Sequence, residues 1–105
     1  MDLQLQGKKA IVTGGSRGMG KAIARHLARE GCDVAIGART EGPLREAATE
    51  IIRETEREIV PLVVDVLNAE SIKGFVQAAA DTFGGVHILA NCAARVGGTI
   101  PDNMD

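Results

Sequence analysis

The pattern of hydrophobic positions changes in the first part of the chain from a continuous run to a helical spacing. Residues 10–13 are apolar or β-branched, as in a buried strand of a parallel sheet. After a glycine-rich segment, apolar side chains recur at the spacing of one helical face: Met19, Ile23, Ala24, Leu27 and Ala28. Gly31 is a helix stop at the usual C-terminal position. The order of strand, turn and helix predicts the first half of a βαβ unit.

The same alternation continues through the rest of the chain. Residues 32–38 are expected to form the second strand, residues 59–64 the third and residues 86–91 the fourth. Two further helices are predicted between these strands by apolar or small residues at helical spacing: Leu44, Ala48, Ile51, Ile52 and Thr55, and then Ile72, Phe75, Val76, Ala79 and Phe83. Gly84 and Gly85 end the last of these helices.

Alternating strands and helices determine the expected fold class. The order βαβαβαβ predicts an α/β, Rossmann-like parallel sheet with helices on both faces, strand order 3-2-1-4, truncated after the fourth strand. Pro61 lies inside the third strand and cannot donate a ladder hydrogen bond, which is acceptable because this strand is at the edge of the sheet. We expect one dinucleotide-binding domain, a partial Rossmann domain, over residues 1–105.

Four glycines lie between the first strand and the first helix: Gly14, Gly15, Gly18 and Gly20. A turn with so few side chains lets backbone N–H groups approach a pyrophosphate, and the following helix directs the positive end of its dipole at the same anion. Because the turn joins a strand to a helix inside a βαβ unit, it indicates dinucleotide binding rather than an ordinary loop. We assign Gly14 to the tight turn, Gly18 to the approach of the phosphate and Gly20 to helix–strand packing.

The charge of the residues at the end of the second strand determines whether the site prefers NADP or NAD. A carboxylate at this point would accept hydrogen bonds from a ribose 2′-hydroxyl and repel a 2′-phosphate. Residues 37–40 instead read Gly-Ala-Arg-Thr, and the first carboxylate is Glu41. Arg17 and Arg39 would converge on the ribose, where guanidinium groups pair with phosphate through two hydrogen bonds. We therefore expect NADP(H) as the cofactor. The alternative is a pair of solvated surface arginines.

Composition and charge exclude other classes of function. The net charge is −2 and the basic residues are dispersed, which argues against a nucleic-acid or membrane-surface partner. No apolar run is long enough for a membrane span, and the N-terminal residues lack a leader pattern, so we expect a cytoplasmic protein. Cys32 and Cys92 lack CxxC spacing and are expected to be buried free thiols. His26 and His87 have no ligand-type neighbours at metal-binding spacing, so no metal site is expected.

Four segments resemble the classical short-chain dehydrogenase/reductase family. Residues 13–20, Thr-Gly-Gly-Ser-Arg-Gly-Met-Gly, are similar to its TGxxxGxG motif, and residues 91–94, Asn-Cys-Ala-Ala, look like a variant of its NNAG segment. Residues 65–66 resemble the family's acidic position beside the adenine, and residues 5–8 its usual lead-in. The resemblance implies the following nucleotide contacts: Gly14, Ser16, Arg17, Gly18, Met19, Gly20, Arg39, Thr40, Asp65, Val66, Asn91, Ala93 and Ala94.

The resemblance also implies hydride transfer between a nicotinamide and a carbonyl or alcohol substrate. In the family a Ser–Tyr–Lys arrangement with a supporting Asn carries the chemistry, with Tyr as acid/base and Lys lowering its pKa. These residues lie beyond position 105 in full-length members, and this chain contains no tyrosine. The pattern differs further at Cys92 and Ala94, where the family has Asn and Gly. We expect the NADP(H)-binding part of an oxidoreductase, inactive alone, with a small-molecule substrate only in a full-length form.

Two alternatives stay open at this point. The chain could be a stand-alone nucleotide-binding or interaction module without catalysis, or a degenerate remnant that folds and binds nothing. In each case the fourth strand would be an exposed edge carrying Val86, Ile88 and Leu89, which is a template for pairing with another chain. We therefore expect a homo-oligomer formed through this edge.

Overall fold

The computed structural model describes residues 5–14 and 18–92. In chain order the elements are β1 (Lys9–Thr13), α1 (Gly18–Arg29), β2 (Asp33–Ala38), α2 (Glu41–Thr55), β3 (Ile59–Val63), α3 (Ala69–Phe83) and β4 (Ile88–Asn91). This order confirms the expected alternation of strands and helices.

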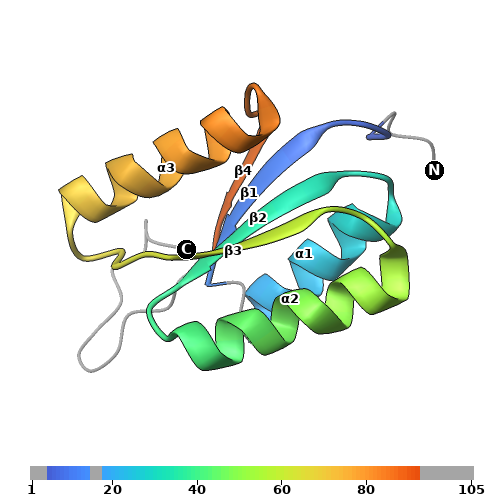
Figure 1. The fold of residues 1–105 in the computed structure, drawn as a ribbon, viewed down its shortest axis with the longest axis horizontal. Helices are drawn as coiled ribbons and strands as arrows, with labels where there is room; N and C mark the ends of the chain where they lie inside the picture. Colours follow the sequence, from blue (N-terminus) through green and yellow to red (C-terminus); the bar gives the residue numbers. More distant parts are fainter. Residues whose placement is uncertain (1–4, 15–17, 93–105) are drawn as a thin grey trace.

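The four described strands form one parallel sheet in the order β3-β2-β1-β4, as predicted. Figure 1 shows α1 and α2 on one face of the sheet and α3 on the other. Thr13 at the end of β1 is in register with Gly37 of β2 and with Asn91 of β4. Pro61 lies in β3, at the edge of the sheet, in register with Ile36 of β2.

Alternation along the strands divides the core into two layers. Side chains from β1 and β2 such as Val12, Val34 and Ile36 are fully buried in the layer beneath α1 and α2. Ile11 and Ala35 point to the opposite face and form the second layer with Val64, which directly follows β3, and with Phe75 and Ala79 of α3. The sheet is therefore covered on both faces, as its parallel topology requires.

The buried face of each helix is narrower than its hydrophobic pattern predicts. In α1 the buried positions are Gly20, Ala24 and Ala28, four residues apart, whereas Met19 is 73% exposed. Met19 precedes this stripe by one residue, about 100° around the helix, and so points away from the sheet. Its assignment to the buried face was wrong. Small residues at these three positions let the helix axis approach the strands closely.

The same difference occurs on the other two helices. Ile52 of α2 is 41% exposed, because the buried stripe of that helix is formed by Leu44, Ala47, Ala48 and Ile51. On α3, Phe75 and Ala79 are buried, while Ile72 and Val76 lie at the rim, each 36% exposed. Their assignment to buried helix faces was therefore only partly correct.

Some strand limits also differ from the prediction. Strand β2 begins at Asp33 rather than Cys32, β3 ends at Val63, and β4 begins at Ile88 rather than Val86. The chain already approaches β1 before β4 begins, since the backbone N–H of His87 donates to the Lys9 carbonyl over 2.8 Å. At each of these strand ends, the hydrophobic run in the sequence is longer than the segment that pairs in the sheet, because apolar residues continue beyond the paired segment.

Both cysteines are free, but their burial differs. Cys32 is fully buried, and Cys92 is only half-buried, so its expected burial was wrong in part. Burial raises the pKa of both thiols above the ordinary value. Within the described residues there is no group of three or more metal-ligating side chains, and no helix is both long and apolar enough to cross a membrane.

Candidate nucleotide-binding site

The carboxyl ends of all four strands lie at one edge of the sheet, because the strands are parallel. From β1 the chain proceeds outward to β2 and β3 and then crosses to the other side of β1 to form β4. In open α/β sheets, ligands bind outside the carboxyl ends at the point where the strand order reverses in this way. Here that point lies between the ends of β1 and β4.

Thr13 and Asn91 meet at this point. The Thr13 hydroxyl donates to the Asn91 side-chain carbonyl over 2.7 Å, and the backbone N–H of Cys92 donates to the Thr13 carbonyl over 3.2 Å. Thr13 is buried and Asn91 is exposed, so the amide of Asn91 is held by one atom and presents its remainder to solvent. The hydrogen bond fixes the two strand ends relative to each other.

The glycine turn follows directly from Thr13. Gly14 has φ +73°, and its N–H donates to the Gly37 carbonyl over 2.7 Å, which ties the turn to β2. Gly18 begins α1 with φ +62°, and no atom lies within 4 Å of the position that a Cβ would occupy there. Gly20 is buried against the sheet, consistent with its expected packing role. Backbone without side chains thus faces open space where a pyrophosphate is expected.

The charge at this turn suits an anion. The first turn of α1 contains no acidic residue, so no carboxylate of this turn opposes the positive end of the helix dipole. Met19, in that same turn, is largely exposed and is available to a ligand at the mouth of the site. The glycine backbone, the free helix end and the absence of carboxylates in this turn fit a dinucleotide pyrophosphate. Of the predicted contacts, Ser16, Arg17, Ala93 and Ala94 lie outside the described residues.

Arg39 and Thr40 follow the end of β2 and are both exposed. Thr40 is the N-cap of α2 with extended backbone, yet its side chain makes no capping hydrogen bond. The nearest carboxylate, Glu41, forms an ion pair with Arg45 one helical turn further on, at 2.8 Å. The N-terminus of α2 is therefore flanked by a cationic residue and by a hydroxyl that does not cap the helix.

Asp65 and Val66 follow β3 in a turn that is fixed by several hydrogen bonds. The backbone N–H of Asp65 donates to the Ser71 hydroxyl over 2.9 Å, and the N–H of Leu67 donates to Asp65 Oδ1 over 3.0 Å. Asn68 caps α3 by accepting from the backbone N–H of Ser71. Asp65 is exposed, and Val66 is half-buried against the α3 layer. The turn offers a carboxylate edge and an apolar side chain to a flat ring.

Gly37 is a residue that the sequence reasoning did not assign to the site. A Cβ at this position would lie 2.7 Å from Val64 Cγ1 and 2.8 Å from Phe75 Cζ, closer than real Cβ contacts. The indication in the sequence was an isolated glycine inside a strand, which is typical of a close approach by another part of the fold.

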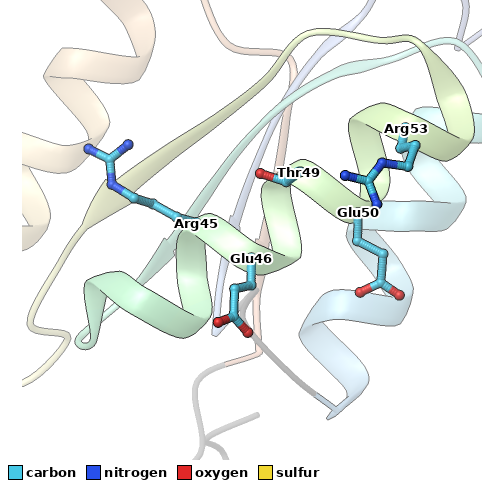
Figure 2. A pocket seen from close by; sticks show the side chains of 5 residues that line it. All are labelled: Arg45, Glu46, Thr49, Glu50 and Arg53. Atoms are coloured by element: carbon cyan, nitrogen blue, oxygen red, sulfur yellow. The ribbon is translucent and has the colours of Figure 1, made fainter.

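The surface hollow drawn in Figure 2 lies elsewhere. Its five lining residues all belong to α2: Arg45, Glu46, Thr49, Glu50 and Arg53. Glu50 is committed to ion pairs with Lys21 and Arg25 of α1, and the hydrogen bond from Lys21 lowers the pKa of this carboxyl. The hollow is open, is lined by charges of both signs and includes no residue of the glycine turn. It is therefore a poor candidate for a dinucleotide site.

Fold and site together define a dinucleotide-binding domain of the Rossmann type. The chain belongs to the short-chain dehydrogenase/reductase family, since residues 8–104 match the family model described as short chain dehydrogenase. This confirms the family resemblance seen in the motifs.

Curated relatives and solved structures agree with this assignment. The chain is 42% identical to a short chain dehydrogenase of Pseudocercospora fijiensis, with 97% of this chain and 34% of that protein covered. It is similar in fold to the L-sorbose reductase of Gluconobacter frateurii complexed with NADPH and L-sorbose, with TM-score 0.88, 32% identity, and 100% and 40% of the two chains covered.

A further similar structure is a short chain dehydrogenase of Burkholderia cenocepacia in complex with NADP. The TM-score is 0.83 at 35% identity, with 96% of this chain and 41% of that chain covered. The chain thus spans between about a third and two fifths of the length of these three proteins.

Proposed function

We propose that this chain is the NADP(H)-binding part of a short-chain dehydrogenase/reductase that transfers hydride between a nicotinamide and a carbonyl or alcohol substrate. The observation that carries the proposal is the glycine turn, with positive φ at Gly14 and Gly18 and open space at Gly18, beside the acid-free first turn of α1 at the point where the strand order reverses. The cofactor, when bound, supplies the hydride chemistry. The chain's own residues bind and orient it.

The parts of the dinucleotide are assigned by the chemistry of each segment. The pyrophosphate lies on the glycine turn and the N-terminus of α1. The adenine lies against residues 65–66, and the adenosine ribose lies beside Arg39 and Thr40. We assign Asn91, Ala93 and Ala94 to contacts with the cofactor ribose.

Two observations support NADP over NAD. The end of β2 is followed by Arg39 and by Thr40, whose hydroxyl does not cap α2, while the nearby Glu41 carboxylate is paired with Arg45. Two similar structures are described with NADPH or NADP bound. Arg17, where the family motif allows any residue, would add a second cation to the 2′-phosphate.

Calorimetry with NADPH and NADH tests the cofactor preference. We expect NADPH to bind more tightly, and Arg39→Ala to remove most of that difference, since one charge-assisted contact contributes roughly 1.5–3 kcal/mol. Arg53→Ala is the matched control, because Arg53 lies near the other end of α2. Equal affinity of the unmutated chain for both cofactors would contradict the 2′-phosphate assignment.

Catalysis is proposed to need residues beyond this chain. The family's proton donor is a tyrosine, and the chain contains none. Residues 1–105 are therefore proposed to act as one nucleotide-binding domain, which also keeps the alternative of a binding module without catalysis open. An assay of NADPH oxidation by the purified chain with a panel of ketones distinguishes a binding domain without catalysis from an active enzyme. We expect the chain to bind NADPH without turnover. A substrate partner and a cytoplasmic location stay predictions.

A second copy of the chain is the proposed protein partner. Within the described residues, the sheet ends at β4, whose second edge pairs with no strand. Leu89 on this strand is 64% exposed. An unpaired edge with apolar side chains favours pairing with another chain.

A further inference from the structure

Gly37 lies where three parts of the proposed site come together. It is the penultimate residue of β2, two positions before Arg39. Its carbonyl accepts the hydrogen bond from the Gly14 N–H of the glycine turn. Its Cα faces Val64, which directly precedes Asp65, and the ring of Phe75 on α3. Gly37 thus touches the segments on both sides of the adenosine position.

The contact with α3 leaves no room for a side chain. An added Cβ would lie 2.7 Å from Val64 Cγ1 and 2.8 and 2.9 Å from Phe75 Cζ and Cε1. Carbon atoms without a bond between them are most stable at about 3.5–4.0 Å. A methyl group at this position would force β2 apart from Val64 and from α3.

Such a separation would reach Asp65 by two routes. Val64 is fully buried and directly precedes Asp65, so displacing Val64 from β2 would strain the 2.9 Å hydrogen bond from its N–H to the Ala38 carbonyl and would move Asp65. The Asp65 N–H donates to the hydroxyl of Ser71, which lies one helical turn before Phe75 on α3. A change in the distance between β2 and α3 must therefore move the turn at Asp65 relative to Arg39.

We infer that Gly37 is a positioning residue for the adenosine end of the site: its missing side chain sets the distance between Arg39 at the end of β2 and Asp65 after β3. The inference rests on the proposed function, because only a bound dinucleotide places an adenosine between Arg39 and Asp65. Gly37 itself need not touch the nucleotide.

A double-mutant cycle tests this inference with adenosine 2′,5′-bisphosphate as the probe. Gly37→Ala is expected to weaken binding of the probe about tenfold, the effect of one lost hydrogen bond. Phe75→Leu removes the ring atoms that rest on Gly37 and is expected to weaken binding as well. The double variant removes the two contacts of the new methyl with the ring but keeps the one with Val64 Cγ1, and it should therefore restore part of the affinity.

Gly74→Ala is the matched control, since Gly74 precedes Phe75 on α3 and no atom lies within 4 Å of its Cβ position. It should leave probe binding unchanged. Backbone amide spectra of the free protein give a second measurement. The Leu67 N–H, which donates to Asp65, should shift in both single variants and return in part in the double variant.

The outcomes separate the two proposals. If the unmutated chain does not bind the probe, the proposed function fails and this inference with it. If the unmutated chain binds and Gly37→Ala binds equally well, only the inference is overturned. Should Gly37→Ala not fold, Phe75→Leu decides: unchanged probe affinity and an unchanged Leu67 signal would overturn the inference. Restored thermal stability in the double variant without restored affinity would also overturn it.

Discussion

Gly18 is the residue at which backbone conformation and ligand access coincide. It has φ +62°, which side chains rarely adopt, and open space lies around it at the start of α1. Close packing against another element does not require glycine here, whereas the positive φ does. The geometry instead suits a position where a phosphate must come close to the chain.

We expect Gly18→Val to abolish NADPH binding while far-ultraviolet circular dichroism stays nearly unchanged, because the side chain would occupy the phosphate position. Gly7→Val is the matched control. Gly7 also has a positive φ, +80°, and open space around its Cβ position, but it precedes β1 at the opposite end of the strand. A valine at a positive φ strains the backbone comparably in the two variants. If Gly7→Val also lost NADPH binding, backbone strain rather than a blocked phosphate position would explain the effect.

At the level of the elements, the two ends of the strands differ. Ion pairs connect the strands at their amino ends, whereas the carboxyl ends form the proposed nucleotide site. Asp33 at the start of β2 accepts from Lys9 of β1 at 2.6 Å and from Arg57, just before β3, at 3.0 Å. Asp33 is only 8% exposed. Burial acts to raise its pKa, but the hydrogen bonds from Lys9 and the Glu58 N–H, with the charge of Arg57, hold that pKa below its ordinary value.

This arrangement predicts a dependence of stability on pH. Because the pKa of Asp33 is lower in the folded state than in the unfolded state, its contribution to stability is fully present at neutral pH and is lost as the pH falls through the lowered folded pKa. We expect Asp33→Asn to lower the free energy of unfolding at pH 7 by about 2 kcal/mol, since it removes a nearly buried charge from two cations.

Denaturant melts of the unmutated chain and Asp33→Asn should therefore differ at pH 7 and converge at low pH. Asp81→Asn, on the exposed side of α3, is the control and should change stability little. A difference between Asp33→Asn and the unmutated chain that persists at low pH would contradict the role assigned to the charge.

On the scale of the whole molecule, the strand order leaves β4 as an edge of the described sheet. Ile88 is half-buried against the layer beneath α1 and α2, whereas Leu89 is exposed beside it. Pairing of two such edges would continue the sheet and cover Leu89 in both copies.

We expect the chain to form dimers or larger species at micromolar concentration in analytical ultracentrifugation. Leu89→Lys should shift it toward the monomer, since a lysine at an edge opposes pairing. Position 89 is preferable to position 88, where a lysine would also disturb the core. Leu67→Lys, at another exposed leucine, is the control. A monomeric unmutated chain would contradict association through this edge.

Much of the fold and part of the site could be predicted from the sequence. The order of elements followed from local periodicity and from glycine stops, and the strand order from the rules of parallel sheets. The glycine turn was predicted from its place between a strand and a helix. These inferences need only neighbouring residues and a general rule of connection, whereas Thr40 and Asp65 were assigned from the resemblance to the short-chain dehydrogenase/reductase family.

Only the tertiary structure decided which atoms meet across the sheet. The bond from Thr13 to Asn91 joins residues 78 apart in sequence, and that from Lys9 to Asp33 joins residues 24 apart. The exposure of Met19 and the contact of Gly37 with Phe75 likewise depend on the rotation and distance of packed helices. Periodicity along the chain specifies which face of an element is apolar, but the exact approach of two elements is set by the volumes of all the side chains between them.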